Sequence, residues 1–102
     1  MNNNYTAFAF ETVTVLSANG VTSLTSTTYN PHGMPAKAAV VTVGTGPLIN
    51  YVYGTATVSS TVGHTATPFT TIELEGNQQI RDFRTTSVSS ATTATIKVSY
   101  FR

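Results

Sequence analysis

Short runs of β-branched and aromatic residues, interrupted by turn residues at close intervals, constrain the fold of this chain more than any other feature. Branching at Cβ stiffens χ1 in a way that strands tolerate better than helices do. Short strands separated by frequent turns are typical of an all-β sandwich or barrel. The turn signals are Asn19-Gly20, Asn30-Pro31, residues 44–47, Gly54, Gly63, Gly76-Asn77 and residues 87–90.

This pattern predicts one domain that spans residues 1–102, with residues 1–5 as an extended N-terminal arm and with little or no helix. Strands are expected at 5–16, 21–28, 37–43, 48–53, 55–61, 69–75, 80–86 and 91–101. The last strand gives the clearest signal, because apolar and mostly polar residues alternate along it from Ala94 to Phe101. We therefore expect a single compact antiparallel β-sandwich, either jelly-roll-like or immunoglobulin-like.

The first expected strand changes its register. Phe8 and Phe10 stand on even positions, whereas Val13 and Val15 stand on odd ones. Either a β-bulge near Glu11 or a strand that crosses from one sheet to the other accounts for the change.

The segment 16–21 that follows contains Asn19-Gly20, a pair that supplies the positive φ of a two-residue hairpin turn. We expect a tight hairpin there.

Charge is scarce, since only 9% of the residues are charged and the formal net charge is +1. Lys37 stands alone, and the other cations are interleaved with acidic residues, so the sequence lacks the basic cluster that nucleic-acid binding needs. The longest aliphatic run, 38–41, is far shorter than a membrane span, and the first residues lack the pattern of a secretory signal. We expect no nucleic-acid or membrane partner and synthesis in a cytoplasm.

Candidate catalytic and metal sites are weak. Glu73 and Glu75 fall on one strand face, which we expect to face solvent, so neither carboxylate is desolvated as a catalytic acid would be. His32 and His64 belong to no ligand-spaced cluster, and the chain has no cysteine. We therefore expect no enzymatic activity, no metal and no cofactor.

The hydroxyl content suggests a contact function instead. Threonine and serine make up 21 and 9 of the 102 residues. Hydroxyl groups rotate to find partners, so such a surface is buried against another protein at less cost than lysine or glutamate. The candidate contact residues are Asn2, Asn3 and Asn4 in the arm, Tyr29, His32 and Met34 in a proline-restricted loop, and Arg102 as an anchor for a carboxylate.

Residues 38–102 resemble small virion proteins of tailed bacteriophages. The resemblance rests on 47–58 with its Gly54-Thr55 step, on Gly63-His64, on 71–74 followed by 80–84, and on the ending 94–102. It implies a β-sandwich structural component of a bacteriophage particle.

Within that class we favour a capsid decoration, or cement, protein on the capsid exterior. Its partners would be the major capsid protein and further copies of itself, because self-association multiplies weak contacts. A trimer is favoured, since three-fold or quasi-three-fold positions of the capsid are the usual place for such a protein. A tail, fibre or head-to-tail component is the alternative, although the chain shows no repeat of fixed period. A carbohydrate-binding module is a more distant alternative. Tyr51 and Tyr53 share a strand face, but Ile49 shares it too, which favours core packing.

Overall fold

The computed structural model describes residues 5–54 and 57–102. Its strands are β1 (Ala7–Val15), β2 (Thr22–Ser23), β3 (Ala38–Val43), β4 (Ile49–Val52), β5 (His64–Ala66), β6 (Thr71–Glu75), β7 (Arg84–Ser87) and β8 (Ala94–Phe101). The helical elements are α1 (Ser26–Tyr29), the 3-10 turn η1 (Pro31–Gly33) and α2 (Gly76–Asp82).

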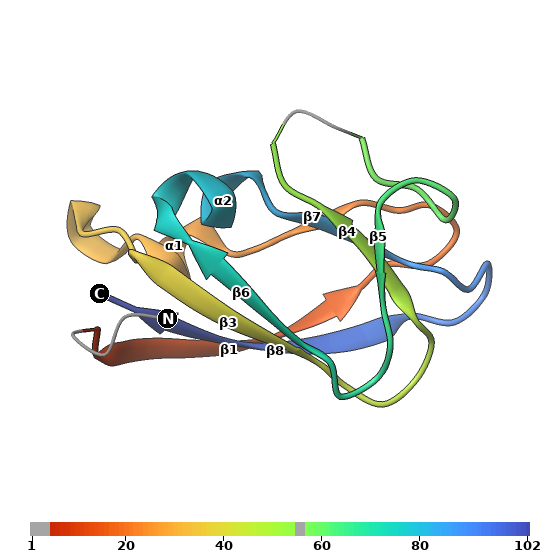
Figure 1. Ribbon diagram of the computed structural model, residues 1–102, viewed down its shortest axis with the longest axis horizontal. Coiled ribbons are helices and arrows are strands. Elements are labelled where there is room, and N and C mark those ends of the chain that lie inside the picture. Colours follow the sequence, from red (N-terminus) through yellow and green to blue (C-terminus); the bar gives the residue numbers. More distant parts are fainter. Residues whose placement is uncertain (1–4, 55–56) are drawn as a thin grey trace.

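The strands form two four-stranded antiparallel sheets that pack face to face (Figure 1). Sheet A has the order β1-β8-β3-β6 and sheet B has the order β2-β7-β4-β5. Among the described strands, β4 and β5 are the one consecutive pair that shares a sheet, so the chain otherwise crosses between the layers at each connection. This is the strand order of an eight-stranded jelly roll. The predicted β-sandwich is confirmed, and the topology is that of a jelly roll rather than an immunoglobulin domain.

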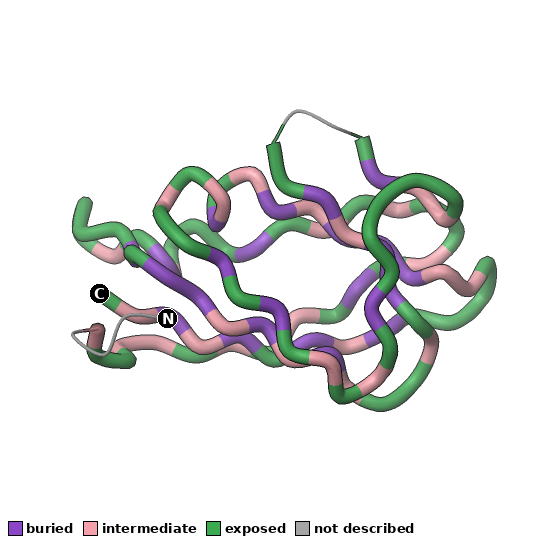
Figure 2. The backbone as a smooth tube through the Cα atoms, in the orientation of Figure 1, coloured by how far each residue is buried: buried purple, intermediate pink, exposed green. Residues whose placement is uncertain are grey.

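Alternation along the strands builds the core (Figure 2). In β8 the buried residues are Ala94, Ile96, Val98 and Tyr100, as the sequence pattern predicts. They pack with side chains from sheet B and from α2, among them Ile49, Ile80 and Phe83. Each of these three side chains removes enough apolar surface from water to contribute on the order of 2 kcal/mol.

The register change in β1 is a local irregularity in the pairing with β8. Ala7 pairs with Phe101 and Ala9 pairs with Tyr100, which leaves Phe8 as the extra residue. The strand stays in sheet A throughout. Of the two explanations left open, the bulge is therefore correct, but it lies at Phe8 and not near Glu11.

The predicted hairpin at 16–21 is wrong. Ala18 and Asn19 have positive φ, and the Gly20 amide donates to the Ser17 carbonyl, so a tight turn does form. However, β1 and β2 belong to different sheets, and the turn connects the two layers.

Two predicted strands are partly helical. Segment 21–28 gives only the two-residue β2 before α1 begins, and segment 80–86 gives β7 only after α2 ends. In α2, the side chain of Gln79 accepts a hydrogen bond from the Glu75 amide at 2.8 Å, and Ile80 is the buried residue. Figure 1 shows both α-helices near the end of the sandwich where the carboxyl terminus lies.

The strand predicted at 55–61 is also wrong in its described part. Residues 55–56 lie outside the described residues, and 57–61 form no strand. The segment instead folds over the outer face of sheet B, where Val58 is buried and the Ser59 carbonyl accepts a 3.0 Å hydrogen bond from Asn50. The edge strand β5 comes later, at His64–Ala66.

Candidate functional site

A pocket lies at the end of the sandwich beside the carboxyl terminus. We call it the terminal pocket. It has a volume of about 660 Å³ and is lined by Tyr5, Met34, Pro35, Ala36, Lys37, Gly76, Asn77 and Arg102. Its lining is mainly apolar, and it contains two cationic side chains and no carboxylate side chain. A pocket of this size and character suits an apolar group that carries a negative charge.

Backbone pairing fixes the chain end beside this pocket. Thr6 and Arg102 exchange two backbone hydrogen bonds of 3.0 and 3.1 Å, which extend the pairing of β1 with β8. The Arg102 guanidinium lies 4.2 Å from the centre of the Phe8 ring and donates a 3.2 Å hydrogen bond to the Met34 carbonyl. The ring of the bulged Phe8 thus packs against the Arg102 guanidinium, and Arg102 in turn holds the loop that carries Met34.

The loop that carries Met34 is stiffened by its own geometry. Two prolines restrict it, and His32 and Gly33 have positive φ. The Met34 amide donates to the Pro31 carbonyl at 3.0 Å, and the Ala36 amide donates to the Tyr29 carbonyl at 2.7 Å. Met34 is consequently presented with 55% of its side chain exposed.

A polar cluster beneath the loop ties α1 to sheet A. Tyr100 donates a very short hydrogen bond to the Glu11 carboxylate, and Thr25 donates its hydroxyl to the same group at 2.7 Å. Burial and this hydrogen bond raise the pKa of Tyr100 well above its ordinary value. The ring of Tyr29 packs on Tyr100 with centroids 5.9 Å apart.

The predicted contact residues therefore separate into four groups. Met34 and Arg102 meet at the terminal pocket. Tyr29 requires a correction, because its ring is buried in the core and supports the loop instead of facing a partner. His32 is exposed but lines a different, smaller groove, and Asn2, Asn3 and Asn4 lie outside the described residues.

Sequence reasoning missed Tyr5, Lys37 and Asn77 as members of the pocket. They come from three separate segments, so no local spacing connects them. The one available signal was Lys37, an isolated cation directly after the proline-restricted loop.

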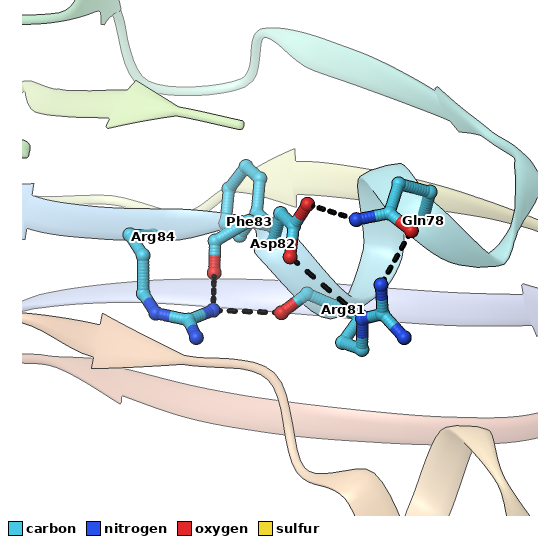
Figure 3. Close-up of polar contacts among 5 residues, drawn as sticks. All are labelled: Gln78, Arg81, Asp82, Phe83 and Arg84. Atoms are coloured by element: carbon cyan, nitrogen blue, oxygen red, sulfur yellow. Dashed lines mark hydrogen bonds and ion pairs between the residues drawn. The ribbon is translucent and has the colours of Figure 1, made fainter. Parts of the chain in front are cut away.

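The cations of α2 and β7 make contacts within the chain (Figure 3). Arg81 lies 3.8 Å from the Asp82 carboxylate and also contacts Gln78. The Arg84 guanidinium donates to the Arg81 and Phe83 carbonyls at 2.8 and 2.7 Å, where α2 ends. The positive charge of Arg84 therefore stabilises the carboxyl-terminal end of α2, where the last carbonyls lack helical partners.

An aromatic group lies on sheet B and consists of Tyr51, Tyr53 and His64, with Phe83 packed against Tyr51. The centroids of the first three rings lie 5.4 to 6.5 Å apart with interplanar angles of 25 to 39°. Burial, and then the nearby Tyr53, raise the pKa of Tyr51. Tyr51 packs against the core as expected, whereas Tyr53 is 43% exposed.

Among residues 5–54 and 57–102, no group of three or more histidine, aspartate or glutamate side chains is placed to hold a metal ion. Glu73 and Glu75 both project from β6 to the solvent, and His32 and His64 lie in different elements.

None of the described helices has the length and apolar character that crossing a membrane requires. Comparison of the chain with protein-family models, with curated proteins and with solved structures finds no significant match.

Proposed function

We propose that this protein is a non-enzymatic structural component of a bacteriophage particle, a decoration protein that binds the major capsid protein on the outside of the shell and stabilises it. The observation that carries the proposal is the terminal pocket, a fixed apolar recess bordered by Lys37 and Arg102. The resemblance of residues 38–102 to phage virion proteins supplies the class of particle.

The fold supports the same class by analogy. Eight-stranded jelly rolls form viral capsid domains, and they also form lectins and cupins, so topology alone leaves the function open. A low charge favours a structural role further. With 9% charged residues, the surface can be buried against a neighbour at a small desolvation cost.

The experiment uses capsids that lack the protein. Wild-type protein is mixed with them, and binding is measured by co-sedimentation, with its mass in solution measured by light scattering. We expect the wild type to sediment with the shell and to raise the temperature at which the shell opens. The variants M34A and R102A are expected to lower the affinity about tenfold each, because each removes a side chain from the contact.

The matched control for R102A is R81A, which removes an exposed arginine outside the pocket. Equal binding by R102A and R81A would contradict the assignment of the contact surface. A wild-type protein that does not sediment with the shells would contradict the decoration function and would favour the tail or head-to-tail alternative.

Carbohydrate binding is a second candidate, favoured by one observation. The ring of Tyr53 forms offset stacks with Tyr51 and His64, whose centroids each lie 6.5 Å away, and Tyr53 is still 43% exposed. Such a half-exposed ring offers a flat apolar surface to a sugar. A glycan array with wild type and Y53A tests this function, and equal signals from the two would exclude the ring as a sugar platform.

A further inference from the structure

The outer face of sheet A is exposed to solvent along its centre, and we propose that it binds the same face of a second copy of this chain through a two-fold contact. Its central positions are Phe10 on β1, Lys97 and Ser99 on β8, Val40 and Thr42 on β3, and Glu73 on β6. All six are intermediate or exposed. This inference does not depend on the proposed function, because self-association needs no capsid.

Two phenylalanines on this side of the molecule are the most exposed large apolar side chains of the described chain. Phe10 is 70% exposed and Phe69 is 73% exposed. Lys97 lies between them, since it lines one shallow pocket with Phe10 and another with Phe69. Exposed apolar groups this large, surrounded by hydroxyl-bearing residues, are typical of a surface that a partner covers.

The position of Phe69 is strained. Its φ is +68°, a left-handed conformation that bulky side chains seldom adopt. The surrounding turn holds it there. The Phe69 amide donates to the Val43 carbonyl at 2.7 Å, and the hydroxyls of Thr67 and Thr70 share a 2.8 Å hydrogen bond. The sandwich thus maintains a costly conformation that exposes an aromatic ring, which points to a use for that ring.

Charges of opposite sign lie on the two sides of the centre of the face, and Glu75 projects from the same face of β6 nearer its edge. Lys97 pairs with Thr42 on one side of β3, and Glu73 pairs with Val40 on the other side. A two-fold axis that lies in the plane of the face, passes between Val40 and Thr42 and runs perpendicular to the line from Lys97 to Glu73 exchanges the positions of Lys97 and Glu73. It sets Lys97 of each copy opposite Glu73 of the other, so the face is complementary to itself.

The area of the face suits a modest dimer. Strands lie about 4.8 Å apart and rise about 3.3 Å per residue, so four strands of this length cover on the order of 500 Å². Two such faces together bury on the order of 1,000 Å², which is near the lower limit for a specific interface. We therefore expect a dimer that dissociates on dilution in the micromolar range. The terminal pocket lies at the end of the sandwich and stays open in this arrangement.

Charge reversal tests the contact. The variants K97E and E73K each place like charges at both symmetry-related contacts, so each is expected to weaken the dimer about 100-fold and to give a monomer by sedimentation equilibrium. Mixing the two variants restores both contacts with opposite sign, and we expect a heterodimer of wild-type affinity. The matched control is R81E, which carries the same charge change on α2, outside both the face and the terminal pocket, and keeps the wild-type mass.

Three results would overturn the proposal: a wild-type chain that stays monomeric at millimolar concentration, a dimer or trimer whose mass neither reversal changes, or two monomeric variants that do not associate when mixed. Circular dichroism and urea unfolding establish that each variant is folded. If K97E lowers capsid binding while the wild type is monomeric, the face is a shell contact and the second copy is excluded.

Discussion

The two sheets of this molecule each have four antiparallel strands but differ in what covers their outer faces. On sheet B, Asn50 and Val52 project outward from β4 and are buried, because segment 57–63 folds over them. Asn50 donates to the Ser59 carbonyl at 3.0 Å and accepts from the Thr65 hydroxyl at 2.8 Å. On sheet A, the corresponding strand β3 projects Val40 and Thr42, and both remain partly exposed.

A glycine makes the cover on sheet B fit. Gly63 has a φ of +127°, and a Cβ atom there would lie 3.0 Å from the Tyr51 carbonyl oxygen. Glycine therefore allows segment 57–63 to approach β4 more closely than any other residue at position 63 would allow. The difference between the faces shows that hydroxyl-rich strands alone do not decide what is buried; the connection between β4 and β5 does.

The largest expected effect comes from placing a charge under the cover. Val52 and Val40 both project outward from the third strand of their sheets, which makes them a matched pair. We expect V52D to lower the free energy of unfolding by about 3 kcal/mol or more, because the carboxylate is buried without a partner. The same change in V40D is expected to cost less than about 1 kcal/mol.

Urea unfolding of both variants at submicromolar concentration checks this comparison, since the proposed dimer is dissociated there. A V40D variant as unstable as V52D would mean that sheet A is covered within the monomer.

A smaller effect is expected from the polar contacts of the cover. The change N50A removes the amide that donates to the Ser59 carbonyl and accepts from the Thr65 hydroxyl, and we expect the loss of these two hydrogen bonds to cost about 1 to 3 kcal/mol. Ser99 on the open face of sheet A provides the control, because S99A is expected to change the stability by less than about 0.5 kcal/mol. Thermal and urea unfolding of the two variants give the comparison, and equal losses would show that Asn50 is not what holds the segment.

The strands with strict alternation were predictable from the sequence. In β6 and β8, one face is apolar and the other is polar, so local pattern and burial agree. Segment 57–61 also consists of residues that favour strands, but apolar and polar residues do not alternate along it. Its one apolar residue, Val58, is buried against the outer face of sheet B instead. Propensity describes how a residue suits a strand, and tertiary packing decides whether a strand exists there.

The helices and the candidate site were harder to predict from the sequence. The segment Gly76–Asp82 is rich in glutamine and contains no β-branched residue except Ile80, a signal for helix that the neighbouring strand pattern outweighed. Tyr29 was selected for its aromatic ring, and burial of that ring depends on Tyr100, 71 positions away. The terminal pocket joins residues from both ends of the chain and from its middle, so only the fold brings them together.

The smallest expected effect is a pH dependence that compares the tyrosine inside each sheet. Tyr100 on sheet A and Tyr51 on sheet B both have a raised pKa. Burial and then Glu11 raise the pKa of Tyr100, and burial and then Tyr53 raise the pKa of Tyr51. An unfolded tyrosine loses its proton near pH 10, whereas the native residues keep theirs longer. The native state therefore binds more protons above that pH, and the free energy of unfolding falls as the pH rises through 10, with no contribution from these groups below about pH 9.

For Tyr100 the loss at pH 10.5 is under about 1 kcal/mol, since only the unfolded chain titrates there. Unfolding in urea at pH 8.5 and at pH 10.5 is expected to show a weaker pH dependence for Y100F than for the wild type, and a smaller change for Y51F, whose ring is only partly buried. A Y51F variant that removes more of the alkaline loss than Y100F does would reverse the comparison and would place the better-shielded hydroxyl on sheet B.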